Sequence, residues 1–347
     1  MRHLRAVLHT HDVIIIGQGI AGTVLSESLH ARGLRVLVFD APREGRATHA
    51  AAGLVNPVVL RTTTPSWRAQ EMLAVAGAFY RELEQRYDAR FWNPVELLAL
   101  FPSAKEAGIW RARMKDPDLA RMISEGPVAD PAVADLPHPF GVGVVRRSAW
   151  VDVRNLLQAH RSHWMAEGRL VERDVAGTDV HRTAEGVRIG EVTAPLLIHC
   201  TGAFAPDLAL VPVRGEGLTV RVDGLRLRSA VHRGVFVLPV GDDRYRVGAT
   251  FAWEAPWSGP SEEGRRWLLD RAQRVVPRSM EVVEHWWGVR PTTRDRRPLL
   301  GRTAPHEAVL NGLGSRGVLL APWCAQHLAA HLFDGGALDP EVDVSRF

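Results

Sequence analysis

The first regular pattern in the chain is a short run of β-branched apolar residues, Val13–Ile16, which follows Asp12. Such a run predicts a strand buried on both faces, as at the centre of a parallel sheet. Apolar residues at helical spacing follow over 23–33, and a second apolar run over 34–40 ends in an acid. The pattern therefore predicts a strand–helix–strand unit in an α/β domain.

Later patterns predict a second domain of a different kind. Apolar side chains recur at helical spacing over 66–87, and 236–251 is typical of a hairpin, with two apolar strands around Gly-Asp-Asp. A chain of 347 residues is also too long for one compact core. No apolar run approaches the roughly 18 residues that span a bilayer. We expect two domains and no membrane span.

Composition narrows the class of protein. Two cysteines, Cys200 and Cys324, give neither a disulfide framework nor a metal-ligand cluster, and are expected to be buried thiols in a reducing cytoplasm. Residues 1–12 have no long apolar core and no small-residue cleavage site, so we expect no signal peptide. The net charge of +4 suggests an anionic partner, but the arginines are scattered and only Lys105 and Lys115 are lysines.

A glycine motif, GxGxxG, lies between the first predicted strand and helix. Gly17 allows the tight turn, Gly19 lets the backbone approach a pyrophosphate, and Gly22 lets helix and strand pack closely. The acid that ends the second strand can accept both hydroxyls of an adenosine ribose. The predicted dinucleotide contacts are Gly17, Gly19, Ile20, Ala21, Gly22 and Asp40. They fit NAD and FAD equally well.

The segment after Asp40 indicates FAD. The chain continues there into a loop of small residues, 48–53, followed by an apolar segment. This stretch resembles the second flavin-contacting loop of the glycine oxidase and D-amino acid oxidase superfamily. The resemblance implies FAD as cofactor, with contacts from Thr48, Ala52, Gly53 and Leu54.

The resemblance extends over most of the chain through motifs in the family's order. Residues 169–180 resemble the strand that contacts adenine, and 196–206 resemble the strand that returns to the FAD domain. Residues 213–220 resemble the strand that leads into the substrate domain. Residues 286–301 resemble the GxRPxxxDxxPxxG signature, and 311–333 resemble the last glycine-rich turn. The further cofactor contacts implied are Val175, Thr201, Gly202, Gly314, Arg316, Gly317, Val318 and Leu319.

The family also implies an architecture. We expect a Rossmann-like FAD-binding domain of the glutathione-reductase type, assembled from 1–75, 142–212 and 286–347. An α+β substrate domain with an antiparallel sheet would collect 76–141 and 213–285. Both domains would therefore be discontinuous in sequence.

The last glycine-rich turn leads into a helix that we expect to begin near Ala321, with Pro322 in its first turn. Hydride transfer to flavin N5 leaves negative charge at N1 and the C2 carbonyl. A helix N-terminus directed there supplies about half a positive charge. Arg316 could reinforce that charge or reach the substrate, or it could be a surface arginine.

Arg290, in the GxRP signature, is the strongest candidate substrate contact. The resemblance implies that it binds the substrate carboxylate, for which a guanidinium offers two parallel hydrogen bonds. The alternative is a structural arginine that pairs with Asp295 or Glu284. Phe236 and Phe251 match family positions on the hairpin that line the substrate pocket. Phe236 stands where relatives often have a tyrosine, which puts a glycine-sized substrate in doubt.

These observations predict an FAD-dependent oxidoreductase that oxidises the C–N bond of a primary or secondary amine, or of an amino acid, by hydride transfer to flavin N5. The substrate would be a small amine bearing a carboxylate. One alternative is a carboxymethylamino group on a tRNA wobble uridine, because GSRG at 314–317 resembles the FAD domain of the bifunctional tRNA-maturing enzyme. A non-catalytic flavoprotein is a third hypothesis. No lysine matches a position over the flavin, so oxygen could be a slow electron acceptor. The sequence indicates neither the amine nor the oligomeric state.

Overall fold

The computed structural model describes residues 10–347. The first nine residues, which include most of the stretch expected to lack a signal peptide, lie outside the described residues. The chain divides into two units, each built from separated stretches of sequence. The first unit holds the residues up to 46 together with 154–211 and 291–347, and the second holds 47–153 and 212–290.

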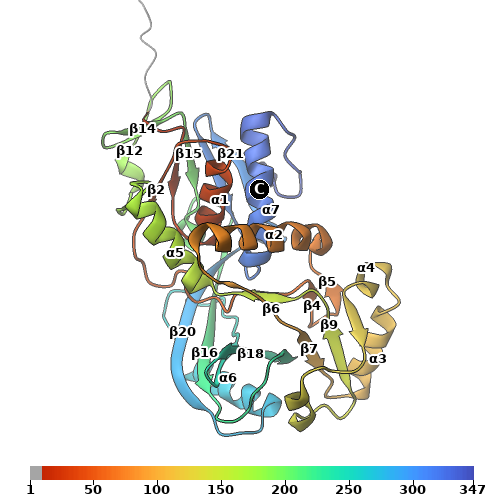
Figure 1. Ribbon diagram of the computed structural model, residues 1–347. Helices are drawn as coiled ribbons and strands as arrows, with labels where there is room; N and C mark the ends of the chain where they lie inside the picture. Colours follow the sequence, from red (N-terminus) through yellow and green to blue (C-terminus); the bar gives the residue numbers. More distant parts are fainter. Residues whose placement is uncertain (1–9) are drawn as a thin grey trace, which may run out of the picture. The chain divides into compact units, whose positions relative to one another are not determined.

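The first unit is built on a six-stranded sheet in the order β11-β2-β1-β15-β22-β21 (Figure 1). Its strands run parallel except for β21, which is antiparallel to β22. The strands are β1 Val13–Ile16, β2 Val36–Asp40, β11 Leu170–Glu172, β15 Leu196–His199, β21 Leu299–Ala304 and β22 Glu307–Asn311. The helices are α1 Ile20–His30, α5 Val153–Ala166 and α7 Gly317–Asp334, with short helices η2 Gly177–Asp179, η3 Gly202–Phe204 and η4 Val344–Arg346. The predicted strand–helix–strand unit is therefore present as β1-α1-β2.

The core of this unit explains why β1 is a run of β-branched residues. β1 lies between β2 and β15 in the middle of the sheet, and its Val13, Ile14 and Ile15, whose side chains alternate between the two faces, have no exposed surface. Ile14 packs in a cluster with residues of a small three-stranded sheet. That sheet consists of β12 Val180–Arg182, β13 Val187–Ile189 and β14 Val192–Ala194.

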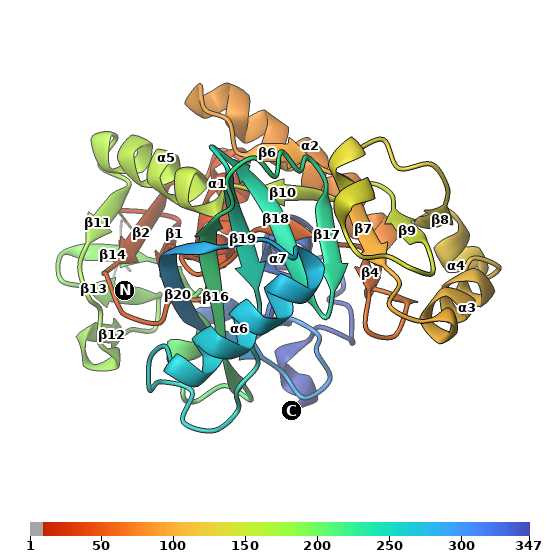
Figure 2. The same cartoon turned by 90° about the horizontal axis from the view of Figure 1, so that it is seen from below.

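The second unit is built on an eight-stranded sheet in the order β20-β16-β19-β18-β17-β7-β9-β8. β7 and β17 are parallel, and the other pairs with a described register are antiparallel. The strands are β7 Leu97–Leu100, β8 Ile123–Glu125, β9 Val142–Val145, β16 Val211–Arg221, β17 Ala230–Arg233, β18 Val235–Gly241, β19 Arg244–Gly248 and β20 Glu281–Thr292. Helix α6, Glu262–Val275, crosses one face of this sheet over β17, β18 and β19 (Figure 2).

The predicted hairpin is formed by β18 and β19. Gly241 pairs with Arg244, so the turn contains only Asp242 and Asp243. Both aspartates have φ of 52°, as a two-residue type I′ turn requires. Val237 and Val247 of the two strands are fully buried in the cluster that α6 covers.

The remaining elements of the second unit include the helix expected over 66–87, which runs from Ala69 to Tyr87 as α2. The other helices are α3 Ala104–Arg113, α4 Pro117–Ala120 and η1 Pro131–Asp135. Two small sheets are formed by β3 Leu54–Val55, β10 Ala149–Val151 and β6 Trp92–Pro94, and by β4 Val58–Val59 with β5 Thr64–Pro65.

The two units divide the chain at different places from the domains expected from sequence. Residues 47–75, 142–153, 212 and 286–290 were expected in the FAD-binding domain, but they group with the second unit. Strand pairing gives the physical reason, because β3 in the first of these stretches is hydrogen-bonded to β10 in the second. The assignment of the stretches to a functional domain stays a prediction.

No helix within residues 10–347 is long and apolar enough to cross a membrane.

Candidate functional site

The glycine-rich turn of the first unit has the geometry of a dinucleotide-binding loop. Gly17 has φ of 102°, which side chains rarely allow. A Cβ at Gly22 would lie 1.8 Å from the carbonyl oxygen of Gly17, so the turn and α1 can pack together only with glycine at that position. Gly19 is the N-cap of α1, and Ile20 and Ala21 form its first turn. The N-terminus of α1 is therefore directly attached to the turn, where its N–H groups favour an anion.

Asp40 ends β2 beside this turn and is 7% exposed. Its Oδ1 accepts a hydrogen bond from the backbone N–H of Gln18 at 2.9 Å. Its Oδ2 accepts one from Arg161 at 2.9 Å, and Arg46 lies 3.4 Å away. A carboxylate offers about four acceptor positions. Asp40 is therefore held in place as an acceptor by groups on the turn, on α5 and on the loop after β2.

A buried polar network supports the turn from α5. The Gln18 side chain donates to the carbonyl of Leu157 at 2.8 Å and lies 3.1 Å from Nδ1 of His160. Nε2 of His160 lies 2.9 Å from the hydroxyl of Ser26, which donates to a backbone carbonyl. Burial lowers the pKa of His160 to about 3. The neutral ring can accept at Nδ1 and donate at Nε2, which satisfies both neighbours.

Sequence reasoning missed Gln18, His160 and Arg161. Gln18 stands at a variable position of GxGxxG, so the motif gives it no role. The available signal was His160 on the apolar face of the α5 helix, where a polar ring requires partners.

The last glycine-rich turn precedes α7 in the same unit. Gly314 has φ of 54°, and its N–H donates to the carbonyl of Pro291 at 3.0 Å. A Cβ at Gly317 would lie 2.9 Å from a methyl carbon of Ile20. The first turns of α7 and α1 therefore pack together, with Val318 and Leu319 buried. Two helix N-termini with the same partial charge are side by side in this unit.

The expected start of this helix was wrong. Helix α7 begins at Gly317 rather than near Ala321, so Pro322 lies inside it. Pro322 cannot donate a hydrogen bond to the carbonyl of Val318, but the apolar residues around it are buried and their packing maintains the helix. Arg316 is the N-cap residue, and burial together with Arg296 lowers its pKa. The side chain is half-buried, and its predicted contact with cofactor or substrate stays a prediction.

The other predicted cofactor residues of this unit lie at strand ends. Val175 follows β11 and packs with Phe39 of β2. Thr201 follows β15 and precedes the short helix that begins at Gly202. The carbonyl of Gly202 accepts from the side chain of Asn311 at 3.0 Å. These positions lie after the carboxyl ends of parallel strands, where open α/β sheets bind ligands.

The small-residue loop lies in the second unit. Its backbone turns at Thr48, whose carbonyl accepts from the N–H of Ala51 at 3.1 Å. Gly53 has φ of 76°, and a Cβ there would lie 1.9 Å from the carbonyl oxygen of Val151. Ala52 is buried, and Leu54 begins β3. Gly53 therefore serves close backbone packing, and the predicted contact of this loop with flavin stays a prediction.

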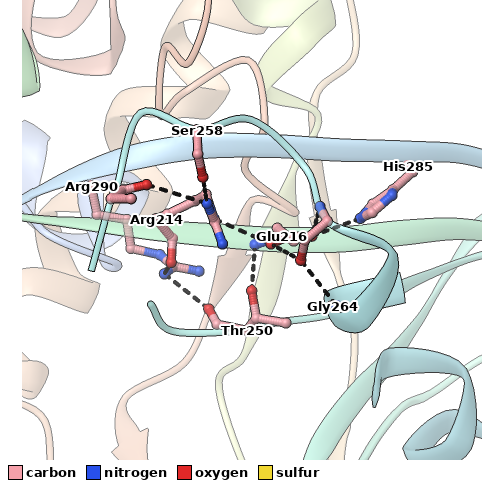
Figure 3. Close-up of polar contacts among 9 residues, drawn as sticks. Arg214, Glu216, Thr250, Ser258, Gly264, His285 and Arg290 are labelled. Atoms are coloured by element: carbon pink, nitrogen blue, oxygen red, sulfur yellow. Dashed lines mark hydrogen bonds and ion pairs between the residues drawn. The ribbon is translucent and has the colours of Figure 1, made fainter. Parts of the chain in front are cut away.

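Arg290 lies on β20 of the second unit. Its Nη1 donates to the carbonyl of Thr250 at 3.1 Å and faces that of Arg214 at 3.5 Å (Figure 3). The ring centroid of Phe251 lies 4.3 Å from the guanidinium carbon, within the range of a cation–π contact. Burial lowers the pKa of Arg290 to about 10, so the group is still charged at neutral pH.

The proposed alternative partners of Arg290 have partners elsewhere. Asp295 pairs with Arg346 at 2.8 Å, and Glu284 accepts a hydrogen bond from Thr219. Phe236, on β18, lies over Gly248, where a Cβ would be 2.6 Å from its ring. The structure therefore brings Arg290 and Phe251 together, and places Phe236 on β18, which β16 and β19 separate from β20 in the same sheet.

A second buried network in this unit was not predicted. The carboxylate of Glu216 accepts from the N–H and hydroxyl of Ser261 at 2.9 and 3.0 Å. The same carboxylate lies 2.9 Å from His285 (Figure 3). Arg214 lies 3.2 Å from the same carboxylate. Glu216 is 1% exposed. The signal in the sequence was an acid between two glycines in a strand that is otherwise largely apolar.

The residues of the first unit fit the phosphates and adenosine ribose of a dinucleotide. The glycine cradle at Gly17 and Gly22 leaves no space for a side chain, and Asp40 is held as an acceptor at the strand end. FAD would be bound through phosphates at α1 and ribose at Asp40.

Comparison with known proteins identifies the class. Residues 12–331 match the family described as FAD dependent oxidoreductase. The chain therefore belongs to this family of FAD-dependent enzymes, as the motifs predicted.

Individual relatives are more distant. The chain is 25% identical to a glycine oxidase of Bacillus licheniformis, over 92% of both chains. It is 24% identical to the tRNA 5-methylaminomethyl-2-thiouridine biosynthesis bifunctional protein MnmC of Marinobacter nauticus, over 92% of this chain and 55% of that protein. The chain thus spans about half the length of such bifunctional relatives. The crystal structure of glycine oxidase from Geobacillus kaustophilus has the same fold, with a TM-score of 0.83, 23% identity and coverage of 98% and 100%.

Proposed function

We propose that this enzyme oxidises the C–N bond of a small primary or secondary amine, or an amino acid, that carries a carboxylate. The observation that supports this substrate class is Arg290. A half-buried guanidinium that is charged at neutral pH favours an anionic partner, and its planar fork matches a carboxylate. Similarity to a glycine oxidase over 92% of both chains supports the same class.

Bound FAD would supply a two-electron acceptor for the hydride that leaves the carbon bearing the nitrogen. The residues of the chain bind and orient. Arg290 would hold the carboxylate, which fixes the direction of the reacting C–H bond. The amine must react in its neutral form. Loss of the hydride leaves an iminium ion, which takes up water and separates into a carbonyl compound and ammonia or an amine. No general base of the protein is required for this scheme.

Kinetics on Arg290 variants test the proposal. Arg290→Lys keeps the charge but loses the two-pronged geometry, and Arg290→Ala loses both. Loss of a desolvated charge-assisted pair costs about 2–5 kcal/mol, or roughly thirty to several thousand times in kcat/KM. The loss should appear in KM and in the anaerobic rate of flavin reduction, with FAD content unchanged.

A matched control is Arg244→Lys, which changes an exposed arginine of the same sheet. Arg244→Lys should leave KM, the rate of flavin reduction and FAD content unchanged. A structural role for Arg290 predicts the reverse result: poor folding or lost flavin, with a normal KM in the active fraction. That outcome would sink the carboxylate proposal.

The tRNA substrate remains the alternative, supported by the similarity to MnmC. It predicts salt-sensitive retention of tRNA by the protein. The tRNA alternative would be excluded if the protein did not bind tRNA, or if salt did not weaken the binding. A non-catalytic flavoprotein would show a flavin band that no amine bleaches. The cytoplasmic location, which depends on the cysteines, stays a prediction.

A further inference from the structure

The guanidinium of Arg290 lies over a strand position that has no side chain. A Cβ at Gly215, on β16, would lie 2.0 Å from Nη2, 2.2 Å from Cζ and 2.4 Å from Nη1 of Arg290. These distances are far below ordinary contact, so any other residue would displace the guanidinium. Gly215 is not among the glycines with positive φ, so its backbone would accept a side chain. The guanidinium of Arg290, rather than the backbone conformation of Gly215, therefore excludes a Cβ at residue 215.

The rotation of the guanidinium is fixed as well. The hydrogen bond to Thr250 and the longer contact with the carbonyl of Arg214 both involve Nη1, which directs that nitrogen at the backbone. The ring of Phe251 packs against the group at 4.3 Å. The guanidinium of Arg290 therefore has little orientational freedom, because a strand without a side chain lies beneath it, a ring packs against it and two carbonyls lie at one of its nitrogens.

The two carbonyls belong to backbone that is itself held. The N–H of Thr250 donates to the carbonyl of Glu216 at 3.0 Å, and the N–H of Glu216 donates to the hydroxyl of Thr250 at 2.8 Å. Arg214 and Ala252 exchange backbone hydrogen bonds at 2.9 and 3.0 Å. The Glu216 carboxylate then connects this strand to Ser261, the N-cap of α6.

From these contacts we propose that Gly215 and Phe251 are positioning residues, which fix the direction in which Arg290 presents its guanidinium and so determine the affinity of the enzyme for carboxylates. The inference rests on the proposed function, in which Arg290 binds the substrate carboxylate. According to this inference, the lack of a side chain at Gly215 contributes to substrate selection.

The test uses the FAD-loaded enzyme and acetate, a carboxylate with no amine, as a competitive inhibitor of amine oxidation. Gly215→Ala should raise the inhibition constant of acetate by at least about tenfold, because the displaced guanidinium loses its two-pronged contact. The control is Gly217→Ala, two residues along the same strand, where a Cβ would lie 1.9 Å from the Trp286 ring. Both variants should lose thermal stability, but Gly217→Ala should keep the acetate constant within about threefold.

Combination with Arg290→Lys separates positioning from general damage. In the Arg290→Lys background, Gly215→Ala should change acetate inhibition little, because the group that it displaces is already gone. If Gly215→Ala does not fold, Phe251→Ala replaces it, since Phe251 is 54% exposed and tolerates truncation. Phe251→Ala should weaken acetate inhibition in the wild-type background and not in the Arg290→Lys background.

The outcomes are distinct. If Arg290→Lys itself leaves acetate inhibition unchanged, the proposed function fails. If Arg290→Lys weakens inhibition but Gly215→Ala or its replacement Phe251→Ala does not, the positioning inference is overturned and the proposed function stands. Equal effects of Gly215→Ala and Gly217→Ala, or full additivity with Arg290→Lys, would also overturn the inference.

Discussion

The backbone N–H of Gln18 donates to the carboxylate of Asp40 over 2.9 Å, which joins the turn after β1 to the end of β2. The dinucleotide motif and its distant acid are thus one hydrogen-bonded assembly. Asp40→Ala should therefore weaken FAD binding in two ways, through the lost ribose acceptor and through a less ordered turn.

The expected cost of Asp40→Ala is on the order of 1.5–3 kcal/mol for each charge-assisted hydrogen bond lost. Titration of apoprotein with FAD measures it. Asp174→Ala, which removes an exposed acid paired with Arg43, is the control and should leave FAD affinity unchanged. Equal affinity of the Asp40 variant and wild type would exclude Asp40 as a ribose contact.

Substitution of two helical glycines by alanine should change the free energy of unfolding in opposite directions. At Gly22 a Cβ would lie 1.8 Å from a backbone oxygen, so Gly22→Ala should separate α1 from the turn and destabilise the protein by about 1–3 kcal/mol. At Gly108, in α3, a Cβ would meet nothing within 4 Å, and alanine should stabilise the helix by about 0.5–1 kcal/mol. Urea unfolding of both variants checks the signs, and an unchanged or higher stability of Gly22→Ala would contradict the packing described for α1.

His160 should make the protein sensitive to acid. Its pKa is about 3 when folded, because burial disfavours the charged ring, while the unfolded chain has the ordinary value of 6.5. Between these values the unfolded state binds more protons, so stability falls as the pH falls from 6.5 towards 3. One such group gives a slope of about 1.4 kcal/mol per pH unit.

His160→Gln should lower the slope of the free energy of unfolding against pH by the contribution of one titrating group. Urea unfolding between pH 6 and about 4 measures this slope. His181→Asn, at an exposed histidine on β12, should leave the slope as it is. An unchanged slope in the His160 variant would mean that the ring is accessible to protons in the folded state.

FAD should be bound without a covalent link through cysteine. Cys200 and Cys324 are both buried, and burial raises the pKa of each thiol, so neither is a ready nucleophile. Acid precipitation should leave a colourless pellet and a yellow supernatant. A pellet that stays yellow would contradict the expectation.

Reduced enzyme should react slowly with oxygen and faster with a quinone. The two lysines of the chain lie on α3, at Lys105, and just after it, at Lys115, and neither matches a family position over the flavin. Stopped-flow reoxidation in air and with benzoquinone compares the two acceptors. Reoxidation in air as rapid as with the quinone would point to an arginine or histidine in the role of the lysine.

The sequence by itself determined the features that depend on local patterns. The run Val13–Ile16, the glycine motif and Asp40 specify a strand, a tight turn and an acceptor within about 30 residues, because glycine geometry and burial act over short distances. The hairpin was likewise predictable, since two aspartates with positive φ are common in type I′ turns.

Only the tertiary structure decided which polar groups meet across long separations. Glu216 and His285 are 69 residues apart, and Gln18 and His160 are 142 residues apart, yet each pair shares a buried network. No spacing rule predicts such pairs, because they depend on how strands and helices stack. The start of α7 at Gly317 has the same origin, since packing against Ile20 outweighs the hydrogen bond lost at Pro322.

The role of Gly215 shows the limit most clearly. From sequence, this residue is one glycine in a strand, which weakens the strand and suggests a bulge or a close approach. The structure identifies the approaching group as the guanidinium of Arg290, 75 residues further along the chain. A missing side chain has meaning only once its neighbour across the sheet is known, and that neighbour is set by the pairing of β16 with β20.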